Sequence, residues 1–137
     1  MANLRVNLDT AIFNALNVAA VTNEATGGVF NGLAPQGVQP PFVVFQAMSK
    51  TDDYWSYTGR GGVAVYMVKA VDRSIWPKAA GEIDTQIDSV MQDASLSITG
   101  YALLTCRRES DIYLVEDQAG VVYQHIGGLY RILADQS

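Results

Sequence analysis

The fold is decided by the stretch GVAVYMVKAVD, residues 62–72, which is long, rich in valine and apolar at both parities. A pleated strand would divide its side chains between two faces, with Val63, Val65, Met67 and Val71 on one and Ala64, Tyr66, Val68 and Ala70 on the other. A strand that is apolar on both faces needs cover on both, and helices can supply one cover. A chain of 137 residues has little left for the second face. A neighbouring subunit is therefore a candidate cover for it.

Length and composition predict one globular domain, residues 1–137. A chain of this size buries about two-thirds of its unfolded surface, which is enough for a core. Hydrophobic residues make up 49% and charged residues 17%, below the roughly one-quarter of average domains. Such a composition suits subunits that bury faces against one another.

The charge balance and the single cysteine exclude several classes of protein. A net charge of −5 argues against a protein that grips nucleic acid through its phosphates. Cys106 alone cannot form an internal disulfide, and it is consistent with a reducing compartment. The N-terminus lacks a basic region followed by an apolar run, and no stretch approaches a membrane span. We therefore expect a soluble protein made in the cytoplasm.

Hydrophobic periodicity predicts two helices. The first covers residues 6–21, with Asn7 or Asp9 as its cap and Gly27-Gly28 beyond its end. The second follows Ser74, a candidate cap, and Pro77 near its first turn. Its apolar stripe consists of Ala80, Ile83, Ile87, Val90 and Met91.

Strand patterns fill most of the remaining chain. Residues 42–48 read as a first long strand, which residues 51–61 join to the central strand as an extended hairpin arm. Further strand character covers 96–108, broken at Gly100, and residues 111–116 form either a separate short strand or a polar-edged excursion. Residues 121–133 close the sheet, with Gly127-Gly128 as a bulge or a place of close backbone approach. The predicted fold class is α+β, an antiparallel β-sheet with two α-helices packed on one face.

Candidate chemistry is sparse, so we expect no enzyme, no metal site and no cofactor. His125 and Cys106 are the only residues of their types, and a strand cysteine is usually a small core residue. One histidine and one cysteine cannot build a zinc site. The pairs Asp52-Asp53 and Asp84/Asp88 are interpreted as solvated loop and helix-face charges.

Two clusters are candidate contact surfaces between proteins. Tyr54, Trp55 and Tyr57 with Arg60 have the composition of contact hot spots, although they could equally fold back over the core. The run Arg107-Arg108-Glu109 reads first as an ordinary charged strand edge and second as an intersubunit ion pair. The predicted subunit or tail interface comprises Asp53, Tyr54, Trp55, Tyr57, Arg60, Arg107 and Arg108.

The order of elements resembles the tail terminator, or tail completion, proteins of bacteriophages with long flexible tails. The resemblance rests on the opening helix, Val29-Phe30-Asn31, Pro35-Gln36-Gly37 and Pro41-Phe42-Val43-Val44, followed by the valine-rich strand. The second helix ending before Leu96 and the closing Tyr130-Arg131-Ile132 fall in the same order. The likeness covers nearly the whole chain.

This resemblance implies a structural virion protein of the tail or neck, without catalytic residues and assembled in the host cytoplasm. Its implied partners are copies of itself in a homohexameric ring, the tail-tube protein and the head–tail connector. DNA would pass through the ring without specific binding, and no membrane is involved. The ring would cap the tail tube, end its polymerisation and join head to tail. The alternatives are another neck or tail component, either a head-closure protein or a tail-tube subunit, and a small-ligand-binding α+β domain with a pocket between sheet and helices.

Overall fold

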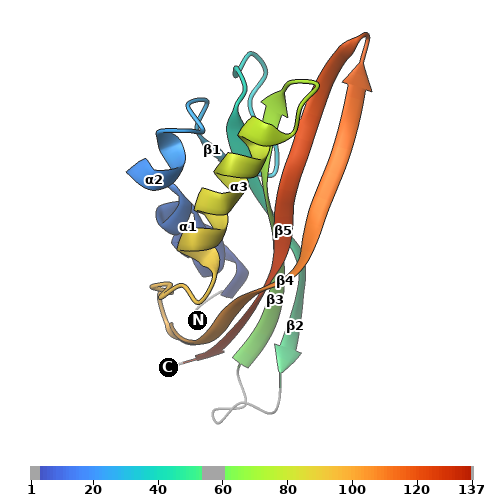
Figure 1. Cartoon of the computed structure of the whole chain (residues 1–137). Helices are drawn as coiled ribbons and strands as arrows, with labels where there is room; N and C mark the ends of the chain where they lie inside the picture. Colours follow the sequence, from blue (N-terminus) through green and yellow to red (C-terminus); the bar gives the residue numbers. More distant parts are fainter. Residues whose placement is uncertain (1–3, 54–60, 137) are drawn as a thin grey trace.

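The computed structural model describes residues 4–53 and 61–136, which form one curved sheet with the helices on one of its faces (Figure 1). The strand order is β1-β2-β3-β5-β4, and β2, β3, β5 and β4 are mutually antiparallel neighbours. The short β1 runs parallel to β2, which makes the sheet mixed. The predicted α+β class is confirmed. The elements are α1 (Leu4–Leu16), α2 (Ala19–Thr22), β1 (Val29–Asn31), β2 (Phe42–Asp53), β3 (Gly61–Arg73), α3 (Lys78–Met91), β4 (Tyr101–Gln118) and β5 (Val121–Gln136).

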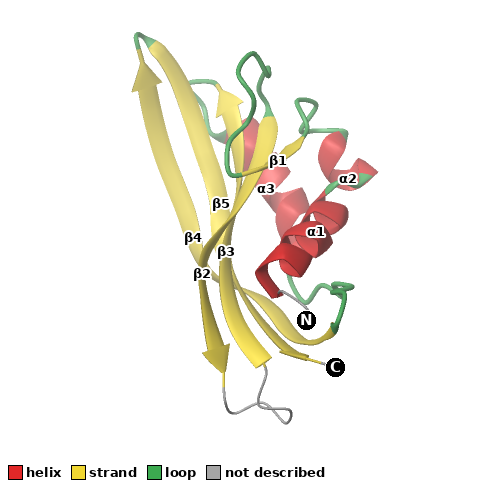
Figure 2. Cartoon of the chain, turned by 180° about the vertical axis from the view of Figure 1, so that it is seen from behind, coloured by secondary structure: helices red, strands yellow, loops and turns green. Residues whose placement is uncertain are grey.

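The valine-rich stretch is β3, at the centre of the sheet and paired on both sides. Its predicted division into two faces is confirmed, because Ala64, Tyr66, Val68 and Ala70 are buried under the helices. On the opposite face Val63, Val65 and Met67 are only half-buried. No helix of the described chain covers that second face, which we call the open face (Figure 2).

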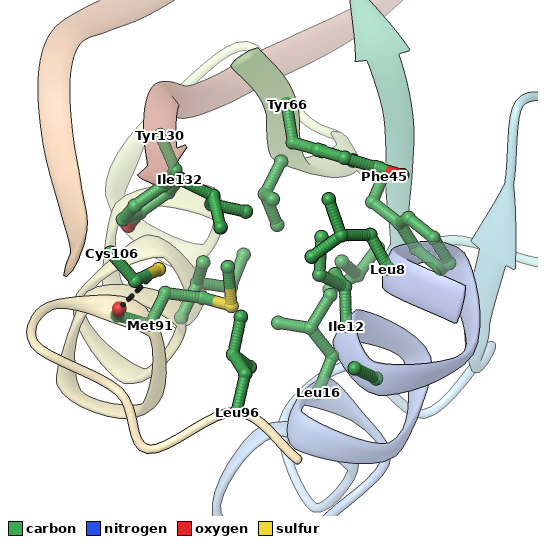
Figure 3. Close-up of a cluster of buried hydrophobic side chains, with 14 of the residues drawn as sticks. Leu8, Ile12, Leu16, Phe45, Tyr66, Met91, Leu96, Cys106, Tyr130 and Ile132 are labelled. Atoms are coloured by element: carbon green, nitrogen blue, oxygen red, sulfur yellow. Dashed lines mark hydrogen bonds between the residues drawn. The ribbon is translucent and has the colours of Figure 1, made fainter. Parts of the chain in front are cut away.

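The core lies between the helices and the covered face of the sheet (Figure 3). Leu8, Ile12 and Leu16 of α1 recur at four-residue spacing and point inward, as do Ile83, Ile87 and Met91 of α3. Burying a side chain of this size stabilises the fold by about 1.5–3 kcal/mol. The sheet contributes Phe45, Tyr66, Tyr130 and Ile132.

The first predicted helix is two helices in the structure. α1 ends at Leu16, and Val18 is extended (φ −128°, ψ 157°) before α2 begins. Leu16 and Val21 are both fully buried, although on a continuous helix they would lie about 140° apart. The break therefore lets both reach the core.

The predicted helix caps are wrong. α1 begins before Asn7 and Asp9; Asn7 Nδ2 donates to the Thr99 carbonyl, and Asp9 accepts from a tyrosine. α3 has Pro77 at its N-cap without a side-chain cap, and Ser74 Oγ instead accepts from the Trp76 backbone N–H.

The segment expected to break near residue 110 is one continuous strand, β4. Irregularities between Leu103 and Thr105 and between Arg108 and Ser110 absorb extra residues without ending the pairing with β5. A tight turn through Ala119 and Gly120, both with positive φ, joins the two strands. The predicted close approach at Gly127 is confirmed, because a Cβ there would overlap the Val68 carbonyl oxygen and the Lys69 backbone.

Two further observations concern residues 4–53 and 61–136. None of the helices there has the length and apolar character needed to cross a membrane. Nor do three or more His, Cys, Asp or Glu side chains in these segments gather into an arrangement that could hold a metal ion.

Candidate interaction surface

Arg108 joins β4 to α3 and β5. Its two terminal nitrogens donate to the two carboxylate oxygens of Asp84, both at 2.9 Å, in the paired geometry that suits a guanidinium. Its Nε donates to Asp111 at 2.8 Å. Its terminal nitrogens also donate hydrogen bonds to the Tyr130 hydroxyl oxygen and the Gly127 carbonyl oxygen. Only 15% of the side chain is exposed. We call this set of contacts the Arg108 joint.

Gly128 leaves the room that the joint needs. A Cβ at this position would lie 2.5 Å from Arg108 Nε and 2.7 Å from Cζ. The guanidinium therefore occupies the space that any larger residue at position 128 would take. The sequence pattern flagged this glycine pair, but it did not show that an arginine was the neighbour of Gly128.

Two groups of the joint, Arg108 and Tyr130, have raised pKa values. Burial alone would lower the pKa of Arg108, but its hydrogen bonds to Asp84 and the charge of Asp84 outweigh burial and raise it. Burial, followed by the hydrogen bond to Asp88, raises the pKa of Tyr130. Arg108 therefore stays charged and Tyr130 stays neutral at neutral pH, which keeps the hydrogen bonds between them and the two aspartates of α3 in place.

The surroundings of Asp84, Asp88, Arg107 and Arg108 differ from one residue to the next. The view of Asp84 as a solvated helix-face charge is wrong, because its side chain is 16% exposed and holds Arg108. Asp88, more exposed, accepts from the Tyr130 hydroxyl at 2.9 Å. Arg107 is 69% exposed and bonds Asp93 at 3.1 Å, so the two neighbouring arginines have different surroundings. An intersubunit contact of either arginine stays a prediction.

Beyond the joint, β4 and β5 form an apolar hairpin arm, residues 111–126, which extends past the edge of the helix layer (Figure 1). Tyr113, Leu114 and Val115 are 62%, 54% and 53% exposed although they are consecutive and so alternate between the two faces. Apolar exposure on both faces of a strand is typical of a contact surface. Tyr113, Leu114 and Val115 are not among the interface residues predicted from the sequence, although the apolar run from Ile112 to Val115 was a signal for them.

A pocket of about 280 Å³ lies on the open face, and the arm contributes Glu116, Gln118, Tyr123 and His125 to its lining. Phe42, Val44 and Lys69 line it together with Glu116 and His125. His125 Nε2 lies 2.9 Å from Glu116 Oε1, while its buried Nδ1 has no hydrogen-bond partner among the described residues. Hydrogen bonds from His125 and then Gln118 lower the pKa of Glu116, and burial lowers that of Lys69. The pocket is on the face opposite the helices, not between sheet and helices.

Cys106 and His125 lie on opposite faces of the sheet. Cys106 is in the core, where its thiol donates to the Met91 carbonyl at 3.2 Å (Figure 3). Burial raises the pKa of this thiol to about 11. His125 lines the open-face pocket. The structure thus does not bring the two together as a nucleophile and its base.

The predicted interface residue Asp53 lies at the opposite end of the sheet. Asp53 is the last residue of β2 and pairs with Gly61 of β3. Tyr54, Trp55, Tyr57 and Arg60 lie outside the described residues. The paired residues Asp53 and Gly61 of β2 and β3 and the hairpin arm of β4 and β5 therefore lie at opposite ends of the same sheet (Figure 1).

The chain is thus an α+β domain with one face of its sheet covered by helices, the other face open and exposed apolar residues in the hairpin arm at one end. The chain belongs to the family described as tail completion protein gp17, whose model matches residues 10–126. The fold is similar to that of a chain in the structure titled "Virion of native gene transfer agent (GTA) particle", with a TM-score of 0.77 and 12% sequence identity. That match covers 98% of this chain and 100% of the other. Among curated proteins, none matches significantly.

The family establishes the general role of the protein. It is a structural component of a bacteriophage tail and thus of the virion. The resemblance seen in the sequence is confirmed at this level.

Proposed function

We propose that this tail protein forms a sixfold ring on the end of the tail tube, where it stops polymerisation and presents a surface to the head–tail connector. The observation that carries the proposal is the hairpin arm, whose consecutive residues Tyr113, Leu114 and Val115 are each more than half exposed. A monomer would leave this apolar surface in water, whereas assembly would bury it. A closed ring limits growth, which is what ending a tube requires.

The acidic composition supports a passage for DNA through the ring. With a net charge of −5, the subunit offers no surplus of cations to hold phosphates. DNA would therefore cross the ring without specific binding. The subunits would assemble in the host cytoplasm and remain in the tail or neck of the virion.

The end of the sheet that carries Asp53 is the proposed second contact region, together with Tyr54, Trp55, Tyr57 and Arg60. Arg107, with its side chain 69% exposed, can add a contact, whereas Arg108 already has its partners within the chain. Deletion of residues 54–57 should leave the monomer folded and abolish ring formation or tail joining. A deletion variant that still completes tails would contradict this assignment of the contact region.

The test of the function is binding to isolated tail tubes. Purified protein is mixed with tubes and imaged by negative stain, with light scattering of the protein alone across a concentration series. We expect binding at one end of each tube and an end to its growth when tube subunits are added. Long tubes made of this protein alone would instead identify a tail-tube subunit, and a lack of any binding to tubes would reject the ring proposal.

A further inference from the structure

The pocket on the open face contains a half-buried lysine, Lys69 of β3. Lys69 is in register with Val44 of β2 and with Gly127 of β5, so the three residues share the open face. Gly127 leaves the lysine its room, because a Cβ at this position would lie 2.7 Å from Lys69 Cβ. Val44 and Val71, which also line the pocket, are only 5% and 4% exposed. The side chain of Lys69 therefore lies partly among apolar groups.

Lys69 lacks a counter-ion within the described parts of the chain. Burial lowers the pKa of its amine, and the charge of Glu116 opposes that shift only in part. Both oxygens of Glu116 are engaged elsewhere, since Oε1 lies 2.9 Å from His125 Nε2 and Oε2 accepts from Gln118 Nε2 at 2.8 Å. No described carboxylate forms an ion pair with the lysine. The pocket thus holds a cation that these parts of the chain leave unpaired.

Such a cation favours an anionic occupant with an apolar neighbour. A partly desolvated charge gains more from an opposite charge than one in open water does, because solvent screens the pair less. Phe42, Val44 and Val71 offer apolar surface within the same pocket. Its volume of about 280 Å³ is small for a drug-sized ligand but has room for one or two side chains. The pocket therefore fits a carboxylate next to an apolar side chain of a protein.

The pocket is continuous with the exposed arm. Leu114, which is 54% exposed, is in register with His125 of the pocket wall, so both residues lie on the open face. A subunit that covers the open face of the arm would therefore reach the pocket as well. A second copy of this chain has the matching charge, because its 14 Asp and Glu side chains outnumber its 9 Lys and Arg side chains.

We propose that the pocket around Lys69 receives a carboxylate of the neighbouring copy, together with the apolar side chain beside that carboxylate. This inference rests on the ring of the proposed function and names a contact that would hold adjacent subunits together. In the ring the lysine would gain the ion pair that it lacks in the monomer. The apolar wall of the pocket would be covered at the same time, which removes further apolar surface from water.

Zero-length crosslinking tests the contact directly. A water-soluble carbodiimide joins an amine to a carboxylate that touches it, and the chain has three lysines, Lys50, Lys69 and Lys78. Rings assembled on tail tubes are treated with this reagent, and the crosslinked peptides are identified by mass spectrometry. We expect a ladder of covalent multimers with crosslinks at Lys69, and we expect these crosslinks to be lost in Lys69→Met. The absence of Lys69 from every crosslink between copies would overturn the inference.

The same samples separate this inference from the proposed function. Lys69 joined to the tail-tube protein would identify that protein as the occupant and overturn the assignment to a second copy. Rings on tube ends without crosslinks at Lys69 would overturn the contact and leave the ring intact. If no rings form on tube ends, the proposed function fails, and the contact between copies fails with it.

Substitution of the lysine gives an independent test. Lys69→Met removes the charge but keeps an unbranched side chain, and it should lower the assembled fraction at least about tenfold. Its melting temperature should equal or exceed that of the parent, because a partly buried charge without a partner does not stabilise the monomer. The matched control is Lys78→Met, an exposed lysine at the start of α3, which should assemble like the parent. Equal assembly by both variants, or a lowered melting temperature of Lys69→Met, would contradict the proposal.

Discussion

Tyr66 of β3 and Tyr130 of β5 face each other in register, and each hydroxyl is bound to an aspartate of a different helix. Tyr66 donates to Asp9 of α1 at 2.5 Å, and Tyr130 donates to Asp88 of α3 at 2.9 Å. Both tyrosine side chains are fully buried and lie in the core between sheet and helices (Figure 3). The pair thus fixes both long helices to the two central strands.

Removing either hydroxyl should destabilise the fold. Tyr66→Phe and Tyr130→Phe each lose a hydrogen bond to a carboxylate, and we expect each to lower the free energy of unfolding by about 1–3 kcal/mol. Urea denaturation measures this. Tyr113→Phe is the control, because Tyr113 is 62% exposed, and its change should stay within about 0.5 kcal/mol. Core variants as stable as the control would show that the two hydrogen bonds add nothing.

The same tyrosines should make the protein sensitive to alkali. Burial and the aspartate hydrogen bonds raise both tyrosine pKa values above the ordinary value of 10.0. Above pH 10 the unfolded chain loses tyrosine protons that the folded chain keeps, so the free energy of unfolding should fall as pH rises. Urea midpoints from pH 8 to 11 measure this effect. The double variant Tyr66→Phe/Tyr130→Phe should show a shallower decline, and an identical decline would exclude the tyrosines as its cause.

Neighbouring arginines of β4 should differ sharply in their effect on stability. Arg108→Met leaves Asp84, 16% exposed, without its partner, which should cost about 3–5 kcal/mol. Arg107→Met removes one exposed ion pair and should cost less than about 1 kcal/mol. The pair of variants shares the same chemical change and the same strand. Equal losses in thermal or urea unfolding would refute the assignment of Arg108 as the joint.

Cys106 should resist thiol reagents in the folded protein. Its side chain is 1% exposed, and burial raises its pKa to about 11, so little thiolate is present or accessible at pH 8. A chromogenic disulfide reagent should react slowly with native protein and fully once urea unfolds it. Rapid stoichiometric reaction of the native protein at pH 8 would contradict the burial of the thiol.

Patterning predicted the elements whose burial follows a simple period. The buried residues Ala64, Tyr66, Val68 and Ala70 of β3 alternate along the strand, and those of α3 recur at three- or four-residue spacing, so the layers of both elements follow from the sequence. The break at Val18 does not, because it depends on where Leu16 and Val21 reach the core. Nor does the continuity of β4, since pairing with β5 across two irregularities overrides the local polar residues.

The contact residues were harder to predict than the layers. Arg108 and Asp84 are 24 residues apart on a strand and a helix, so no local spacing relates them. The arm residues Tyr113 to Val115 belong to an apolar run that reads equally well as a buried strand. Only the extent of the helix layer shows that nothing in the described chain covers them.

The length of β4 has a mechanical consequence for the assembled tail. Leu103 of β4 is in register with Ala134 of β5, and Ala134 is in register with Gly62 of β3. β4 therefore begins level with the end of the sheet where β3 starts, and it ends at the tip of the arm. At about 3.3 Å per residue, its 18 residues span about 60 Å. The length of β4 therefore sets an upper limit on the separation between the surfaces at the two ends of the curved sheet (Figure 1).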